Sequence, residues 1–242
     1  MNKLVVSSLV SLVAAGTMAI PATAAFADGS TTSTPTPTTP SGADSVRFEA
    51  AKVRCLAAID ARQVQIGVLK TEARAPKLTD GHRATIVSFL DAAASGLATV
   101  KTEVQAATTI EELRAACSTV VPDYRIYVLR TPQVHLAIGF DLNDVSVNAL
   151  TKAADALQKA IDAEKAAGKD VTDAQAKLDQ MRAELSAASA ATAGQADAEL
   201  ALTPADYNAN HDVLAPFRAA LTTARGHVRT AASLARQIVG EL

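Results

Sequence analysis

The amino-acid sequence predicts an all-α protein, an antiparallel helical bundle with coiled-coil-like seams, and three observations favour this class. Apolar residues recur at steps of three and four in six stretches, which is the spacing of one helix face. Proline and glycine punctuate the boundaries between these stretches. Tryptophan is absent and aromatic residues make up 3% of the chain, so the core must consist of small aliphatic side chains, which favours closely packed helices. Six helices with short connections predict two three-helix bundles in series, joined by a long kinked helix, and a single, longer four-helix arrangement is the alternative.

The first 27 residues have the three parts of a secretory signal peptide. Lys3 precedes an apolar run from Leu4 to Ile20, and small residues follow in a pattern that ends at Ala27. We predict cleavage after Ala27. A retained membrane anchor stays the alternative, because the run approaches the roughly 17 residues that a spanning helix needs. Residues 28–43 are rich in Thr, Ser and Pro, which predicts a disordered linker.

Cys55 and Cys117 are the only cysteines of the chain. Export would place them where thiols oxidise, so we predict an intramolecular disulfide. Closing a loop of about 60 residues would stabilise the fold by roughly 4 kcal/mol in the chain-entropy model. A reactive or metal-binding thiol pair would need a C-x-x-C spacing or a nearby histidine, and the sequence has neither.

The first predicted bundle covers residues 44–131. Its first helix spans residues 45–73, with Cys55 on the buried face, and ends before Pro76 because proline disfavours a helical residue in front of it. Capping residues mark where the next two helices begin. The predicted start of the second is Thr79 or Asp80, and that of the third is Thr108 or Thr109, with Glu111 and Glu112 in its first turn.

The second predicted bundle covers residues 132–242. Thr131 and Pro132 are expected to be the N-cap and the first helical residue of a long helix, which ends at Gly168 as its C-cap. Capping signals predict where the remaining two helices begin. These are Thr172 with Gln175, a capping-box pair, and Thr203-Pro204, which opens a last helix with a kink near Ala215.

Residues 117–140 form the most unusual segment, because they combine a cysteine, two tyrosines, a histidine and two interior prolines. The four-three spacing continues across Pro122, so we predict a kink or a short break there and a helix that restarts at Pro132. A strand is the minority alternative. Rings and arginines concentrate at interfaces, which makes five residues the candidate interaction surface. They are Tyr124, Arg125, Tyr127, Arg130 and His135. The competing interpretation, which the spacing favours, places both tyrosines in the core.

No spacing typical of a catalytic centre, a phosphate-binding loop or a calcium loop occurs. The four histidines lie far apart, and a zinc site needs three or four converging ligands. The nearest candidate for a cation site is Asp206 with His211 and Asp212, for which a helix cap and a solvated pair are the simpler explanation. We therefore expect no enzyme activity, no catalytic residue, no metal and no cofactor.

The formal net charge of −2 is small and its charges are interspersed along the chain. Such a balance gives no electrostatic footprint for nucleic acid or for an anionic membrane surface. We expect a protein or another envelope component as the partner, no nucleic acid, and no membrane span in the mature chain. The expected location is secreted or associated with the cell envelope.

Four segments, RCLAAID, LTDGHRATI, CSTVVPDYRIYVLRTPQVHL and LTPADYNANHDVL, resemble a group of secreted, signal-peptide-bearing helical proteins of actinobacteria for which no activity is known. The resemblance covers most of residues 45–242. It implies export and brings no functional residues with it.

Two hypotheses about function follow from these observations. The first is an exported, non-enzymatic helical-bundle protein that acts as a spacer, scaffold or interaction module at or outside the cell envelope. The alternative is a bundle that binds a small molecule or a metal, in a pocket that the kinked region 122–139 would open between helices.

Overall fold

The computed structural model describes residues 42–74 and 77–242, and in these ranges all regular secondary structure is helical, which confirms the predicted all-α class. The predicted signal peptide and residues 28–41 of the predicted linker lie outside the described residues. The last two linker residues, 42 and 43, already belong to the first helix. No helix in the described part is both long and apolar enough to cross a membrane.

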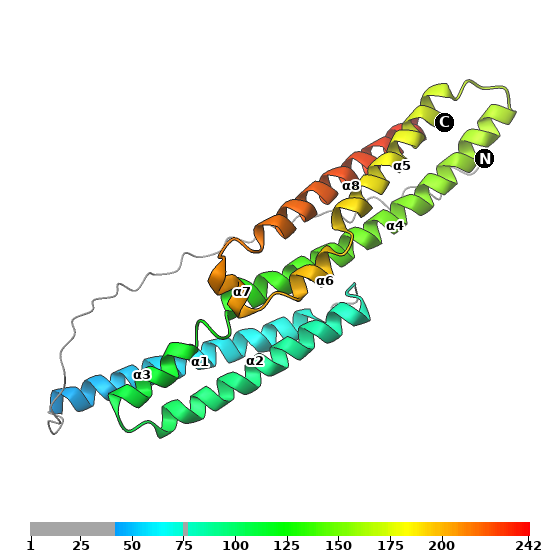
Figure 1. The fold of residues 1–242 in the computed structure, drawn as a ribbon. Coiled ribbons are helices and arrows are strands. Elements are labelled where there is room, and N and C mark those ends of the chain that lie inside the picture. The colour runs from blue at the N-terminus through cyan, green and yellow to red at the C-terminus, as the bar shows by residue number, and fades with distance from the viewer. Residues whose placement is uncertain (1–41, 75–76) are drawn as a thin grey trace.

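The first three helices pack side by side (Figure 1). They are α1 (Gly42–Glu72), α2 (Asp80–Ala106) and α3 (Ile110–Thr119). Local signals set their ends as the sequence predicts: Thr79 caps α2, and Thr109 forms a reciprocal capping box with Glu112 at the start of α3. Leucine, isoleucine, valine and alanine side chains fill the core between them.

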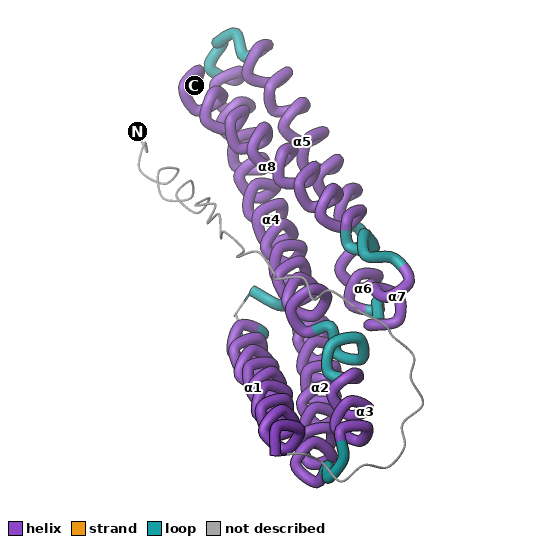
Figure 2. The backbone as a smooth tube through the Cα atoms, turned by 90° about the vertical axis from the view of Figure 1, so that its left-hand side faces the viewer, coloured by secondary structure: helices purple, strands orange, loops and turns teal. Residues whose placement is uncertain are grey.

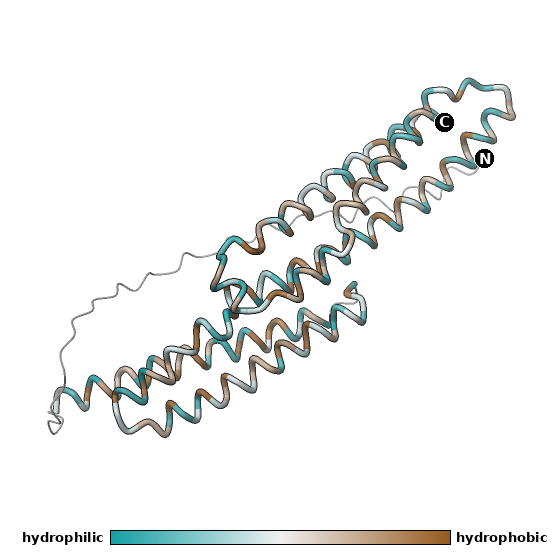
Figure 3. Tube along the Cα trace, viewed as in Figure 1, coloured by the Kyte–Doolittle hydropathy of each residue, from teal (hydrophilic) through white to brown (hydrophobic). Residues whose placement is uncertain are grey.

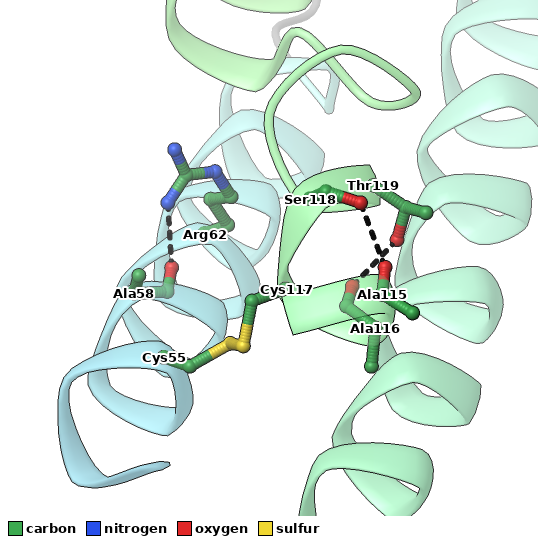
Figure 4. Close-up of a disulfide and its surroundings, with 8 residues drawn as sticks. All are labelled: Cys55, Ala58, Arg62, Ala115, Ala116, Cys117, Ser118 and Thr119. Carbon is green, nitrogen blue, oxygen red and sulfur yellow. Dashed lines mark hydrogen bonds between the residues drawn. A yellow bond between two sulfur atoms is a disulfide. The ribbon is translucent and has the colours of Figure 1, made fainter. Parts of the chain in front are cut away.

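Cys55 of α1 and Cys117 of α3 form the disulfide that links these two helices (Figure 4). The sulfur atoms of Cys55 and Cys117 lie 2.10 Å apart, and the two Cα atoms are separated by 6.0 Å. On α3, the hydroxyls of Ser118 and Thr119 donate to carbonyls one turn earlier, at 2.8 and 2.9 Å. Cys117 therefore sits in the last turn of a ten-residue helix, close to the point where the chain leaves this helix group.

Of the two alternatives predicted at Pro122, a kink or a short break, the structure shows the break, so the third and fourth helices are not one long kinked helix. The chain leaves α3 at Thr119 and passes through a turn in which Arg125 adopts φ 43°, a left-handed conformation that ends helical continuity. A single π-helical turn, η1 (Ile126–Arg130), then runs without interruption into α4 (Thr131–Ala166). Thr131 is consequently a helical residue and not an N-cap, and its hydroxyl donates to the carbonyl of Ile126 at 3.0 Å. The minority strand interpretation is also wrong.

Four helices follow α4: α5 (Thr172–Thr192), α6 (Gln195–Leu200), α7 (Pro204–Ala209) and α8 (Ala215–Glu241). The long helices α4, α5 and α8 pack against one another. Gly168 ends α4 as predicted: it adopts φ 82°, and the backbone amides of residues 168 and 169 bond back into the last turn.

Two local predictions in this half are wrong. The capping box of Thr172 and Gln175 does not form, because Val171 is the N-cap and the Gln175 amide bonds instead to Gln158 and Asp179. The last predicted helix is two helices, since Thr203 and Asp206 do form a capping box but α7 stops after only six residues.

The two helix groups lie one after the other (Figure 1, Figure 2). Apolar residues recur along each helix, so each group has a seam of its own (Figure 3). The boundary is not clean in packing terms, however, because Val134 and Ala137 of α4 and Leu200 of α6 belong to the apolar cluster of the first group. Helix α6 contacts α2, α4 and α8, so it bridges the groups.

Gly96 on α2 allows Tyr124 to lie against that helix, since a Cβ at residue 96 would approach Tyr124 Cε1 to 2.7 Å. We expect Gly96→Ala to destabilise the protein by about 1–2 kcal/mol through overpacking. In a Tyr124→Leu background the same change should stabilise it, because alanine is the better helix former by up to about 1 kcal/mol.

Gly67→Ala is the matched control, since a Cβ at this exposed position of α1 meets nothing within 4 Å. It should stabilise the protein in both backgrounds. Urea denaturation of the variants, arranged as a double-mutant cycle, measures the coupling. A destabilising Gly96→Ala change of the same size in both backgrounds would contradict the contact.

Candidate functional site

Polar side chains gather where α6 lies across α2 and α4, and all of them except Asp197 are buried or half-buried. We call this cluster the polar joint and define it by six residues from four elements. They are His82 of α2, Arg130 of η1, Gln133 and Asp141 of α4, and Asp197 and Glu199 of α6. Gln133, Asp141 and Glu199 are respectively 0%, 3% and 0% exposed. Polar groups so deeply buried cost free energy unless they find partners, so the bonds of each member matter.

Gln133 and Arg130 hold the C-terminal end of α6. The Gln133 amide donates to the carbonyls of Glu199 and Leu202, at 2.6 and 3.0 Å. Arg130 donates to the Gln133 side-chain oxygen at 2.9 Å and also to the Leu202 carbonyl at 3.1 Å. Both side chains thus donate to carbonyls at the end of α6: the Leu202 carbonyl accepts from both of them, and the Glu199 carbonyl accepts from Gln133 and also from the Leu202 backbone amide.

The guanidinium of Arg130 also lies over the ring of Phe89 on α2, 4.4 Å from its centroid. One arginine thus contacts α2 and the chain that leaves α6. Burial lowers the pKa of Arg130, and the nearby Glu199 opposes that shift.

Within the polar joint, the Glu199 carboxyl departs from the rule that buried polar groups are paired. Neither of its carboxylate oxygens has a hydrogen-bond partner among the described protein groups. Burial raises the pKa of Glu199 to about 9, and the positive charge of Arg130 offsets only part of this effect. At neutral pH the carboxyl is therefore protonated in the folded protein.

His82 connects three helices on the other side of α6. Its Nδ1 lies 2.7 Å from Asp141 Oδ1, and its Nε2 lies 3.2 Å from Asp197 Oδ1. The second oxygen of Asp141 accepts from the backbone amide of Thr79 at 2.6 Å, which adds a negative charge at the N-terminus of α2. An imidazole that faces a carboxylate at both nitrogens donates to both only when it is doubly protonated.

The carboxyl of Asp144, one turn further along α4, is also affected by burial and by the charge of Asp141. Burial, and then the negative charge of Asp141, raise the pKa of this carboxyl, while hydrogen bonds from Asn143 and Thr192 oppose the shift. What the polar joint can do chemically is take up and release protons. It presents no thiol, since both cysteines of the chain are at the disulfide position.

Each of the five residues predicted as an interaction surface contacts another segment of the chain. Tyr124 packs on Gly96, and the Arg62 guanidinium lies over the ring of Tyr127. Arg125 donates to the side-chain oxygen of Asn208 at 2.5 Å and lies over the ring of Tyr207. Arg130 belongs to the polar joint, and His135 Nε2 lies 3.0 Å from Glu72 Oε2. Tyr127 is 46% exposed, so the expectation that both tyrosines fill the core is wrong for this one.

The members of the polar joint other than Arg130 were not predicted from the sequence as a site. His82 carried a signal only as a residue near a helix start, and Gln133 and Glu199 look like ordinary surface positions of a helix. The one available signal is the spacing of Glu199 with Ala196 and Leu200, both apolar and both buried, which places the glutamate beside an apolar face.

The predicted candidate for a cation site does not assemble either. Asp206 accepts from the amide and hydroxyl of Thr203, at 2.8 and 2.7 Å, and so acts as the capping residue of α7. These bonds lower its pKa. His211 stacks near Tyr207, and His211 and Asp212 are exposed. Across the described ranges, no three His, Cys, Asp or Glu residues are grouped as metal ligands would be.

Two surface grooves lie away from residues 122–139. One runs between α4 and α5 and is lined by hydroxyl groups and by one acidic and one basic side chain. These residues are Thr151, Asp155, Arg182, Ser186 and Ser189. The other lies between α2 and α3, where alanines alternate with Glu103, Thr108, Glu112 and Thr119.

The importance of Asp141 can be tested directly. We expect Asp141→Ala to destabilise the protein by about 3 kcal/mol at pH 7, because it removes the buried partner of His82 and of the Thr79 amide. Urea denaturation measures the loss. Asp144→Asn is the control on the same helix and should change stability by about 0.5 kcal/mol or less. Equal losses in the two variants would contradict the special role of Asp141.

Comparisons of the chain with protein-family models, with curated proteins and with solved structures found no match.

Proposed function

We propose that the chain is an exported, non-enzymatic helical protein that acts as a spacer and interaction module at or outside the cell envelope, through two three-helix bundles in series. The observation that carries this proposal is the placement of the two helix groups one after the other (Figure 1). Helix α4 alone has 36 residues, which corresponds to about 54 Å at 1.5 Å per residue. An arrangement of this kind separates its two ends and offers long helix faces for a partner.

Two further observations support export. The N-terminal sequence has the parts of a signal peptide. The two cysteines lie at bonding distance between α1 and α3, and disulfides persist in oxidising compartments. The cores consist largely of Ala, Leu, Val and Ile, a composition that fits a closely packed spacer protein.

The alternative function, a small molecule or metal in a pocket near residues 122–139, receives less support from this region. Tyr124 packs on α2, Arg130 covers Phe89, and Gln133 bonds to the end of α6. These contacts make the region a packed connection between helices.

Fractionation of cells that produce the full chain tests the proposal. We expect a protein that starts near Asp28 in the envelope or culture fraction, with a mass two hydrogens below that of its reduced form. Crosslinking on intact cells should then link it to a protein or another envelope component. Retention in the cytoplasm with two free thiols would overturn the proposal. Variants with leucine in place of Ala25 and Ala27 provide the control, because they remove the small residues of the cleavage pattern.

A further inference from the structure

We infer that α6 is a proton-controlled strap: it stays docked across α2 and α4 while the Glu199 carboxyl is protonated, and it lifts from them when this carboxyl ionises. The inference concerns a conformational change within the fold, and it does not rest on the proposed function. Its basis is the burial and pairing of the groups on the two faces of one short helix.

The stability of α6 as a helix depends on its contacts with α2 and α4. It has six residues, and isolated helices shorter than about 12 residues are marginal in water. Its N-cap is Gly194 with φ 68°, and Leu202 follows its other end, so loop residues flank it on both sides. Ala196 and Leu200 supply its apolar contacts, and they belong to two different core clusters. Helix α6 can therefore move without unfolding the long helices beside it.

In the docked position of α6, a neutral Glu199 carboxyl costs less free energy than a charged one. The side chain is 0% exposed and both oxygens lack hydrogen-bond partners. A carboxylate in such a place would lose its hydration without gaining hydrogen bonds. The Gln133 amide cannot help, since it already donates to the carbonyls of Glu199 and Leu202.

Charged and titratable groups from η1, α2, α4 and α8 surround the docked α6. Arg130 of η1 faces Glu199 and offsets part of the cost of its ionisation. On α2, His82 faces Asp197 of α6 and Asp141 of α4. On the same α4 face, Asp144 interacts with Asp141 and His82, and from α8 the Arg225 guanidinium approaches Gly139.

On the α2 side, His82 contacts Asp197 of α6, whose side chain is 83% exposed and therefore well solvated. The pH dependence of docking is assigned to the buried, unpaired Glu199 carboxyl. Acid, which keeps this carboxyl neutral, favours the docked strap.

The size of the effect follows from the two environments of Glu199. The folded pKa is about 9 and the ordinary value is 4.5, so the open strap releases a proton that the docked strap holds throughout this interval. The equilibrium constant for opening then rises by about tenfold for each pH unit between the two values. The increase stops at the pH at which most molecules are already open.

Hydrogen exchange measured by mass spectrometry on the purified oxidised protein, between pH 6 and pH 8, tests this inference. After correction for the intrinsic pH dependence of exchange, we expect the protection of residues 195–202 to fall by about 100-fold in the wild-type protein. In Glu199→Gln it should change by less than about threefold. Peptides around Ile59 and Ile66 in the core of α1 serve as the internal reference, and they should stay more protected than residues 195–202 at every pH because they exchange only through global unfolding.

Each other outcome decides against the strap. Equal loss of protection in wild type and Glu199→Gln would show that Glu199 does not control α6. Equal protection of the α1 and α6 peptides at each pH would show global unfolding in place of local opening. Asp197→Asn supplies a further check: Asp197 is largely exposed, so its loss should reduce the protection of α6 by about fivefold or less and leave the pH slope unchanged.

Discussion

Glu199→Gln is expected to stabilise the folded protein by about 3 kcal/mol at pH 7 and by less than about 1 kcal/mol at pH 5. The reason is the raised pKa of the buried carboxyl, about 9 against an ordinary 4.5. Below pH 4.5 both the folded and the unfolded states hold this proton, so the group does not disfavour folding. Between pH 4.5 and 9 only the unfolded state releases it, so stability falls as pH rises.

The loss amounts to about 1.4 kcal/mol for each pH unit in that interval. Glutamine has the size and shape of a protonated glutamate and cannot ionise, so the variant should keep its stability where the wild type loses it. If α6 opens first, the slope of the wild type becomes shallower at the pH of opening, because Glu199 then ionises in the folded state as well.

Urea denaturation at pH 5, 6, 7 and 8 measures this difference, with wild type and variant in the same buffers. Glu49→Gln is the matched control, since it makes the same chemical change at an exposed glutamate of α1. The control should leave the pH profile of stability unchanged. A variant that is less stable than wild type at pH 7, or a difference that does not grow with pH, would contradict the assignment of Glu199 as a buried neutral acid.

Loss of the disulfide is expected to cost about 4 kcal/mol of unfolding free energy. Cys55 and Cys117 are 62 residues apart in the sequence, and a link across such a loop mainly restricts the unfolded chain. The ten-residue α3 should respond most, because a helix of this length holds its place by contacts with α1 and α2 and by this link.

Denaturation of the oxidised protein with and without a reductant measures the cost, and hydrogen exchange locates it. The double variant Cys55→Ala and Cys117→Ala is the control, since its stability should not respond to the reductant. Unchanged stability of the wild type after verified reduction would show that the link contributes little to this fold.

The sequence predicted the elements whose determinants are local. The Thr109 cap with Glu112 and the Gly168 C-cap depend on residues a few positions apart, so their chemistry can be recognised without the fold. The long seams were equally accessible, because a spacing of three and four residues indicates which face of a helix is buried.

The polar joint could not be predicted in the same way. Periodicity indicates that a face is covered, but it does not indicate which segment covers it. Glu199 becomes a buried acid only because α6 lies across α2 and α4, and this depends on the short turns around residues 194 and 202. In sequence, a glutamate between alanine and leucine in a helix is indistinguishable from a solvated one. Tyr127 shows the converse, since it fits the four-three spacing and is nevertheless half exposed.

The π-turn η1 explains why the spacing failed at that point. A π-turn accommodates one residue more than an α-helical turn, and an extra residue rotates everything after it by about 100° around the helix axis. The phase counted from Tyr124 and Tyr127 therefore does not carry over into α4. In the helix that follows this turn, Gln133 faces the end of α6 and Asp141 faces the start of α2. In evolutionary terms, one codon gained or lost between Ile126 and Arg130 would turn the whole polar side of α4 away from its partners.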